Sequence, residues 1–298
     1  MKIISKDQFV YAMSKDSPAV EHVADGEVFA FDTMDAFSNQ IVSETDFFES
    51  ADWSTVNPAT GPVFVDGAKP GDVLVVEILD IDVGNTGVMV AVPNMGAMGH
   101  LVDRSESKII YIKNGFALFN ENIALPLDPM IGVIGVAPSG EPVPNGTPDC
   151  HGGNMDTKVI RKGNRIYLPV NVDGGLLALG DLHAVMTDGE VGICGVEVGG
   201  RVTVRVSTIK NRKLETPIVE SKDHWYVIGS DIDLDSAVKF TLDQTHLFLS
   251  ARLPLSTNEI CMLMSLICDL QISQIVDPKI TCRMAIQKTP LAKYSLSF

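Results

Sequence analysis

The chain has 298 residues, 45% of them hydrophobic, and its 38 acidic against 23 basic residues give a formal net charge of −15. This composition predicts a globular protein with a large core, and the charge would repel nucleic acid backbones and anionic membranes. The N-terminus lacks the apolar stretch of a signal peptide, and the longest apolar run, residues 260–268, is too short to span a bilayer. We therefore expect a cytoplasmic protein that binds neither nucleic acid nor membrane.

Short strands separated by turn signals dominate the first two hundred residues. Segments 71–83, 108–119 and 130–138 are rich in Val and Ile, and more strands follow within 165–206. Gly, Pro and Asn mark the turns between them. Regularly spaced short strands are typical of a β-sandwich or a barrel-like core.

The composition changes near residue 210, where a charged connector begins. Beyond it we expect a strand over 225–230, a final strand over 276–288, and helices over 236–251 and 255–270. Ser256 or Thr257 can cap the second helix, and Glu259 can face its positive end. The predicted fold class is α+β and predominantly β, with a C-terminal α+β layer. Residues 1–209 would form a β-rich domain and 210–298 a segment packed on it, or both would form one continuous domain.

The five cysteines are odd in number and contain no CxxC pair, so neither a disulfide framework nor a zinc ribbon is indicated. Cys150 precedes His151, which invites the hypothesis of a thiol nucleophile. Neighbouring residues on an extended chain point in opposite directions, so His151 is poorly placed to act as its base.

Three segments concentrate polar residues that can bind metals or move protons. Segment 31–40 contains two acids, segment 149–156 contains acids, a histidine and two glycines, and segment 180–190 contains acids and a histidine. Their candidate residues are Asp32 and Asp35; His151, Asn154 and Asp156; and Asp181, His183, Asp188 and Glu190.

Asp181 and His183 are separated by one residue, so on a strand both side chains point to the same side. A carboxylate with an imidazole suits Zn²⁺ or another first-row cation, whereas carboxylates alone suit Ca²⁺ or Mg²⁺. The alternative is a turn at a strand end, in which Asp181 acts as a cap and His183 is an ordinary hydrogen-bonded residue.

Gly152 and Gly153 permit positive φ and the close approach of another group. Their N–H groups could face a carbonyl oxygen or an anion, as in an oxyanion hole. The alternative is a connecting loop whose acids bond only local amides. His100 lies in a loop rich in Gly and Met that could form a flexible wall.

Glu190 and Glu197 lie next to an apolar strand, where a buried carboxylate needs a partner. A buried Glu often has a raised pKa and can act as a general base and then as a general acid. The alternative is that these side chains point to solvent from an edge strand.

Taken in order, these segments resemble the acetamidase/formamidase family. The resemblance is carried by NPATGP followed by GDVLVVEI (57–78), HGGNMD (151–156), GDLHAVMTDGE (180–190) and further stretches that span nearly the whole chain. It implies a β-rich homo-oligomer, a homodimer or larger, with metal ions near a site that hydrolyses small amides such as formamide or acetamide. Matched by position to the family motifs are Asp32, His151, Asn154, Asp156, Asp181, His183 and Glu190.

One segment departs from the family pattern. Met186 and Thr187 stand where the family usually has a glutamine and a glycine. If that glutamine touches substrate, the apolar Met186 would change the preference of the pocket.

The resulting hypothesis is an amidohydrolase that uses a metal-activated water. The predicted metal ligands, for Zn or Ca, are Asp32, His151, Asp181 and His183. Glu190 is the expected general base, with Asp181 as a second catalytic residue, and the expected substrate-binding residues are His100, Gly152, Gly153, Asn154 and Asp156. Two alternatives stay open: a non-catalytic β-rich binding protein with structural Ca²⁺, and an amidase with Cys150 as nucleophile.

Overall fold

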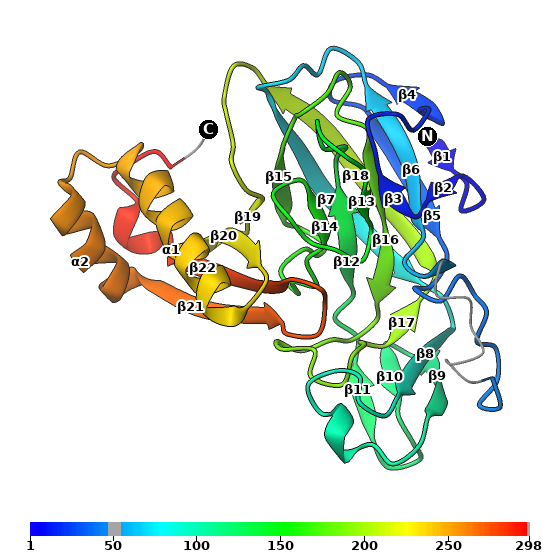
Figure 1. Cartoon of the computed structure of the whole chain (residues 1–298). Helices are drawn as coiled ribbons and strands as arrows, with labels where there is room; N and C mark the ends of the chain where they lie inside the picture. The colour runs from blue at the N-terminus through cyan, green and yellow to red at the C-terminus, as the bar shows by residue number, and fades with distance from the viewer. Residues whose placement is uncertain (47–54, 297–298) are drawn as a thin grey trace.

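Figure 1 shows the computed structural model, which describes residues 1–46 and 55–296. A strand-rich body forms most of the molecule, and the two helices lie together at one end of it, next to β20, β21 and β22. Within the described residues the strands form a nine-stranded sheet, an eleven-stranded sheet and a two-stranded sheet.

The two large sheets bring together strands that are far apart in the chain. In spatial order, the nine-stranded sheet contains β1 (Lys2–Ile4), β5 (Val28–Thr33), β18 (Gly200–Ile209), β7 (Val73–Val83), β15 (Arg165–Pro169), β19 (Ile218–Glu220), β20 (His224–Asp231), β22 (Ile280–Gln287) and β21 (Cys268–Gln274). The eleven-stranded sheet contains β11 (Ala124–Pro126), β10 (Phe116–Leu118), β9 (Glu106–Lys113), β8 (Thr86–Ala91), β17 (Glu197–Val198), β16 (Leu177–His183), β12 (Met130–Gly135) and β14 (Gly152–Asn154), with β6 (Ala59–Val65), β2 (Phe9–Val10) and β4 (Glu21–Val23) joined through β6. The small sheet pairs β13 (Val143–Pro144) with β3 (Ala12–Met13).

One hydrophobic core lies between the two large sheets. Its fully buried side chains come from β7 and β18 of the first sheet and from β12 and β16 of the second, among them Val76, Val204, Ile131, Ile134 and Leu179. Alternate residues of β7 and β18 face this core, whereas β12 and β16 are buried along their whole length. The predominantly β fold expected from the sequence is therefore confirmed, and the described sheets stay open instead of closing into a barrel.

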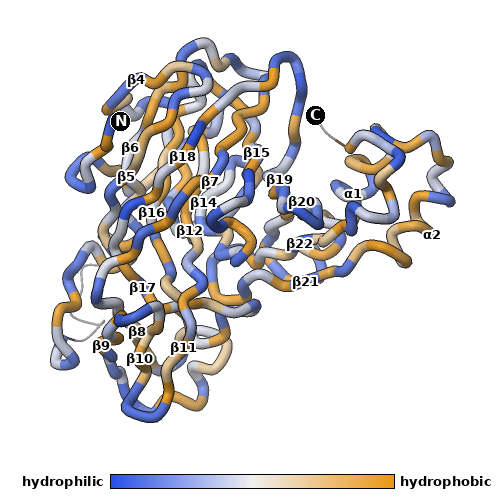
Figure 2. Tube along the Cα trace, turned by 180° about the vertical axis from the view of Figure 1, so that it is seen from behind, coloured by the Kyte–Doolittle hydropathy of each residue, from blue (hydrophilic) through white to orange (hydrophobic). Residues whose placement is uncertain are grey.

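The C-terminal layer has its own hydrophobic cluster, formed by α1 (Leu234–Ser250), α2 (Thr257–Ile267) and the strands beneath them. Ser256 caps α2, as the sequence predicts, and forms a capping box with Glu259; Asp233 caps α1. Figure 2 shows hydrophobic stretches along the body strands and along α2, with hydrophilic residues at many of the connecting turns. No helix in residues 1–46 and 55–296 is long and apolar enough to cross a membrane.

The helix expected over 255–270 ends at Ile267, three residues early. Cys268 begins β21, which pairs antiparallel with β22 along its whole length. The apolar run continues through this boundary, so hydrophobic periodicity alone could not locate it. The described residues also contain two short 3₁₀ helices, η3 (Gly99–Leu101) and η4 (Thr289–Leu291).

Candidate functional site

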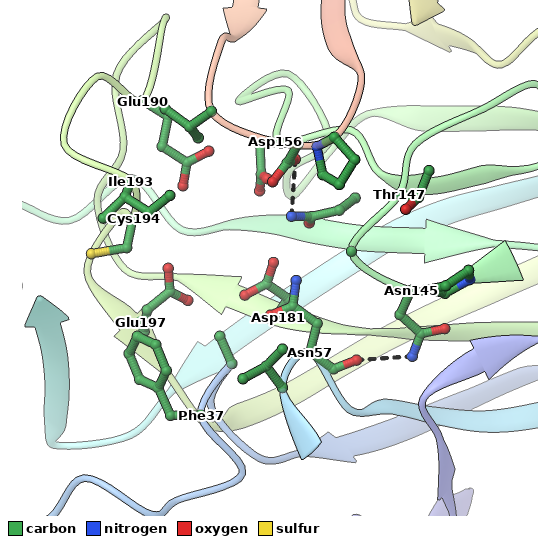
Figure 3. Close-up of a pocket in the computed structure, with 18 of the residues that line it drawn as sticks. Phe37, Asn57, Asn145, Thr147, Asp156, Asp181, Glu190, Ile193, Cys194 and Glu197 are labelled. Carbon is green, nitrogen blue, oxygen red and sulfur yellow. Dashed lines mark hydrogen bonds between the residues drawn. The ribbon is translucent and has the colours of Figure 1, made fainter. Parts of the chain in front are cut away.

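Several acidic side chains line a cavity of about 630 Å³ (Figure 3). The acids come from strands of the eleven-stranded sheet, from the loops that follow them, and from the β21–β22 loop of the C-terminal layer. Together with one imidazole they form what we call the acid–histidine cluster, whose members are Asp156, Asp181, His183, Glu190, Glu197 and Asp277.

Strands β16 and β17 hold the centre of the cluster. His183 and Glu197 are direct cross-strand partners, and His183 Nε2 lies 3.0 Å from Glu197 Oε1. Asp181 lies on the same strand as His183, and its Oδ1 is 3.5 Å from Nε2. The expectation that Asp181 and His183 point to one side is therefore met.

Two loops complete the cluster. Asp156 follows β14, and Glu190 lies in the loop between β16 and β17; their carboxylate oxygens lie 3.8 and 3.9 Å from His183 Nε2. Asp156, Asp181 and Glu190 all have left-handed backbone conformations, with φ of 38°, 54° and 46°. Such conformations are uncommon for residues other than glycine and are maintained by the surrounding structure, and they concentrate at functional sites.

Glycines make room for these side chains. A Cβ atom at Gly132 on β12 would lie 2.6 Å from Asp181 Oδ2 and would also collide with Asp156 Oδ1. A Cβ at Gly195 would lie 2.8 Å from Cγ of the His183 ring. The absence of a side chain at these two positions is therefore a geometric requirement of the cluster.

The cluster is strongly acidic and most of its side chains are buried, and both properties shift the pKa values of its members. Burial raises the pKa of Glu190 well above its usual value, and the nearby Asp156 raises it further. Burial likewise raises the pKa values of Asp156, Glu197 and Asp277. Burial alone would lower the pKa of His183, but the charges of Glu197 and Asp181 hold it well above the ordinary value. Burial also opposes ionisation of Asp181, but the charge of His183 lowers the pKa of Asp181 below its usual value.

Several carboxylate oxygens in the cluster have no hydrogen-bond partner. These atoms are Asp156 Oδ1, Asp181 Oδ1, Glu190 Oε2 and Glu197 Oε2, and all are buried. Two sets of side chains bring one potential ligand atom each to within 4.8 Å of one another: Asp156, His183 and Glu190, and Asp181, His183 and Glu197. Both sets share His183, and both mix nitrogen with oxygen donors.

Two of the predicted metal ligands lie outside the cluster. Asp32 is on β5, and its carboxylate forms a bidentate ion pair with Arg201 of the neighbouring strand β18, at 2.6 and 2.9 Å. His151 is buried, but it neither lines the cavity nor belongs to either set of potential ligands. Burial lowers the pKa of His151 to about 4. The structure therefore places Asp32 and His151 outside the cluster that contains Asp181 and His183: strand pairing directs Asp32 to Arg201, and His151 is buried away from the cavity.

Some of the expected substrate-binding residues lie at the cavity or in the cluster, and others lie outside both. Asn154 lines the cavity and donates from Nδ2 to Asp277 Oδ2 over 3.1 Å, and Asp156 joins the cluster itself. Gly152 and Gly153 have φ of 105° and 88°, and a Cβ at Gly152 would collide with the Ile134 carbonyl of β12. A Cβ at Gly153 would lie 2.5 Å from the Thr147 carbonyl oxygen, so both glycines closely approach protein backbone, and neither lines the cavity. His100 is exposed and does not line it either; Met95 from the same loop does.

Three members of the site are missing from the residues predicted by the sequence. Glu197 is recognisable as a costly buried carboxylate, but local patterns do not assign it to the site. Gly132 and Asp277 give no comparable signal, because Gly132 lies in an ordinary apolar strand and Asp277 is far away in the sequence. Only the tertiary structure brings Asp277 to Asn154 and Asp156.

The unusual segment at Met186 contacts the histidine and does not line the cavity. Met186 Sδ lies 3.2 Å from His183 Nδ1, whereas Thr187 is exposed. A thioether is a weak hydrogen-bond acceptor, so Met186 can hold the Nδ1–H tautomer and leave Nε2 facing the acids.

Cys150 has the properties of an unreactive thiol. Cys150 is exposed and lies outside the cavity, and partial desolvation of the thiol and the adjacent Asp149 raise its pKa to about 11. A thiol nucleophile requires a lowered pKa or an adjacent base, and the described surroundings of Cys150 favour neither.

The chain is similar to known proteins over nearly its whole length. The chain is 44% identical to a Bacillus halodurans acetamidase of known structure, with 98% of this chain and 99% of that chain covered and a TM-score of 0.96. It is 45% identical to a predicted acetamidase/formamidase from Thermoanaerobacter tengcongensis, with 100% and 99% covered and a TM-score of 0.97.

The chain is also 28% identical to a formamidase of Methylophilus methylotrophus over 66% of this chain, and the match covers 63% of that formamidase, less than two thirds of its length. The acetamidase/formamidase family model matches residues 7–145 and 146–289. With nearly the whole chain matched, the protein belongs to the acetamidase/formamidase family.

Proposed function

We propose that the protein hydrolyses linear amides to the carboxylate and ammonia at the acid–histidine cluster, with a divalent metal ion as cofactor. Family membership supports the reaction class. The single observation that best supports a metal is the set of buried carboxylate oxygens without hydrogen-bond donors. Buried carboxylates are costly unless they are protonated, paired or bound to a cation, and here several acids share one imidazole.

The donor set fits a first-row transition ion. Asp181, His183 and Glu197 would hold the ion, because the acid oxygens of this set lie nearest to His183 Nε2, at 3.5 and 3.0 Å. Three protein ligands including an imidazole, with a further position open toward a cavity, are typical of catalytic zinc, whereas calcium prefers oxygen ligands alone. The residues present thus favour zinc over calcium within the predicted pair.

The residues around this position would divide the chemistry between them. A bound divalent ion would supply Lewis acidity, polarising the amide carbonyl and lowering the pKa of water. Glu190 would accept the proton from the attacking water and then donate it to the departing nitrogen, a role that suits a carboxyl with a raised pKa. Asp156 and Asp277 lie beside Glu190 and would help to keep its proton affinity high.

The alternative of a binding protein with structural Ca²⁺ is less well supported. A closed structural site needs no large cavity above it, and here the acids line one of about 630 Å³. Ammonia release from short amides separates the two functions directly, because only the hydrolase produces it.

The decisive experiment combines elemental analysis with an ammonia assay. Purified protein is expected to contain a divalent metal, and removal of the metal by a chelator should reduce ammonia release from amides to background, with recovery when Zn²⁺ is restored. Full activity in the stripped protein would defeat the metal part of the proposal.

A matched pair of variants locates the metal. Asp181→Asn should lose both metal and activity, because it removes a charged ligand. Asp32→Asn should retain both, because its carboxylate is engaged by Arg201 outside the cluster. Metal loss in Asp32→Asn would restore that residue to the ligand set.

We further propose a cytoplasmic homo-oligomer, a dimer or larger, that binds a small amide and neither nucleic acid nor membrane. The net charge of −15 supports the absence of nucleic acid partners. Exposed Met262 and Leu266 on α2 give that helix an apolar surface suited to an interface. The oligomeric state can be measured by light scattering.

A further inference from the structure

The cavity is much larger than formamide or acetamide requires. Acetamide has a single methyl group beyond its amide, whereas the cavity volume of about 630 Å³ falls in the range of roughly 300–1,000 Å³ that accommodates drug-sized ligands. An acetamide bound at the acid–histidine cluster would leave most of this volume filled with water.

One side of the cavity is an apolar wall. In Figure 3, Phe37, Ile193 and Cys194 lie on the side of Glu190 and Glu197. We define the apolar wall as the following lining residues: Phe37, Val90, Met95, Ile193 and Cys194. Water against such a surface is unfavourable, so the wall favours a ligand with an apolar group.

The apolar wall is the side of a packed hydrophobic cluster that faces the cavity, and it is therefore preformed. Phe37, Val90 and Cys194 are buried together with Ile41, Val88 and Val92 behind them, and Met95 and Ile193 pack against this group. The Val90 N–H group donates to Cys194 Sγ over 3.3 Å, which ties β8 to the loop before β17. Because these side chains are packed against the cluster behind them, they cannot readily move into the cavity when the ligand is small.

The opposite side of the cavity is polar. Figure 3 shows Asn57, Asn145 and Thr147 beyond Asp181, on the side away from Phe37 and Ile193. Asn145 is held in place because its Nδ2 group donates to the carbonyls of Val10 and Asn57 at 2.7 and 2.8 Å. An amide bound at the acid–histidine cluster can therefore place its nitrogen toward polar groups and its acyl chain along the apolar wall.

We infer that the preferred substrate is a primary amide with an extended apolar acyl group, such as an aliphatic chain of several carbons or an aromatic ring. This inference rests on the proposed function, since it assigns a substrate class to the same site. The apolar wall contacts the acyl group, and the amide group lies at the acid–histidine cluster.

The test compares ammonia release by the metal-loaded protein from formamide, acetamide, butyramide, hexanamide and benzamide. Each buried methylene contributes roughly fourfold when fully removed from water, so kcat/KM for hexanamide should exceed that for acetamide by about tenfold or more. Equal or higher kcat/KM for acetamide or formamide would overturn the inference while leaving amide hydrolysis intact.

Variants of the wall show whether it produces the preference. Val90→Phe narrows the cavity and Met95→Ala removes part of the apolar wall, so both should lower the ratio of hexanamide to acetamide kcat/KM. Met98→Ala is the matched control for Met95→Ala, because Met98 lies in the same loop, is 46% exposed and does not line the cavity. If Val90→Phe fails to fold, Met95→Ala still tests the contribution of the apolar wall. An unchanged ratio in a folded Met95→Ala protein, or an equal fall in Met98→Ala, would count against the wall.

A binding measurement separates failure of this inference from failure of the proposed function. Ammonia release from none of the amides would contradict the proposed function. In that case calorimetry with hexanamide and acetamide decides the inference on its own: tighter binding of hexanamide supports the apolar wall, and equal or weaker binding overturns it.

Discussion

Glu190 is a carboxyl whose surroundings favour proton transfer. It is 6% exposed, burial raises its pKa well above the usual value, and its Oε2 has no hydrogen-bond partner. We predict that Glu190→Gln lowers kcat for amide hydrolysis by about 10²–10⁴-fold, because an amide cannot accept and return a proton. Since Asp181, His183 and Glu197 would hold the metal, the variant should retain its metal content.

Parallel measurements of ammonia release and metal content test this assignment. A variant that keeps its rate would remove Glu190 from the chemistry. A variant that loses metal and activity together would make Glu190 a metal ligand. The set of potential ligands formed by Asp156, His183 and Glu190 allows that role.

At the scale of single elements, β12 supports the site by having no side chain at Gly132. A Cβ there would lie 2.6 Å from Asp181 Oδ2 and 2.9 Å from the Asp181 carbonyl oxygen. We predict that Gly132→Ala displaces the Asp181 carboxylate and lowers kcat/KM by roughly 100-fold, since small misplacements of catalytic groups are costly.

Gly140→Ala provides the control, because a Cβ at Gly140 meets no atom within 4 Å. Enzyme kinetics on both variants, with circular dichroism to confirm folding, make the comparison. Wild-type kinetics in Gly132→Ala would show that the carboxylate tolerates the added methyl group.

The turn before β7 depends on one buried acid. Asp72 is 5% exposed and accepts hydrogen bonds from the Lys69 N–H group, the Asn211 N–H group and the Lys210 ammonium at 2.9 to 3.0 Å. Burial opposes ionisation, yet these donors lower the pKa of Asp72 below its usual value. We predict that Asp72→Asn lowers the free energy of unfolding by about 1–3 kcal/mol at pH 7, because an amide cannot accept all three bonds.

The sign of the pH dependence follows from the lowered pKa. The unfolded pKa of Asp is about 3.9, so the contribution of Asp72 is present above that pH and is lost as pH falls through the lower folded value. Urea unfolding at pH 7 and near pH 3 should therefore give a smaller difference between wild type and Asp72→Asn at the lower pH. Asp173→Asn, at an exposed ion pair with Lys69, should change stability by less than about 0.5 kcal/mol.

At the scale of the whole molecule, the C-terminal layer and the body share one sheet and one site. Strands β19 to β22 continue the sheet that begins with β1 and β5, and Asp277 enters the acid–histidine cluster from the β21–β22 loop. Arg283 on β22 is 1% exposed and binds Asp188 at 2.8 Å and Thr157 at 3.3 Å, both of which lie in the body.

These links predict one cooperative unfolding transition for the whole chain. Arg283→Met should lower its free energy of unfolding by about 1–3 kcal/mol, because the buried Thr157 hydroxyl loses a hydrogen-bond donor, whereas the exposed Asp188 keeps Lys158 as a second partner. Calorimetry and circular dichroism should give coincident midpoints. Two separated transitions would instead support a division into residues 1–209 and 210–298, which stays a prediction.

How far the sequence alone could predict the molecule depends on the range of the interactions involved. The cap of α2 by Ser256 and the placement of Asp181 and His183 on one side of a strand involve residues two or three positions apart, and both are found. The early end of α2 depends on pairing of β21 with β22, and the removal of Asp32 depends on Arg201 in a strand far along the chain. Periodicity and local spacing contain no information about such partners.

From the sequence come the predominantly β character of the fold, the C-terminal helices, and the segments that contain most of the cluster. These follow from local propensity, capping and side-chain alternation, which act between near neighbours. Which acids meet depends on tertiary packing. This packing brings Glu197 and Asp277 to His183 and Asp156, directs Asp32 to Arg201, and forms the apolar wall from Phe37, Val90 and Cys194. The physical reason is that a buried carboxylate cluster and a preformed cavity require the packing of two sheets and the loops between them, and no local pattern specifies that packing.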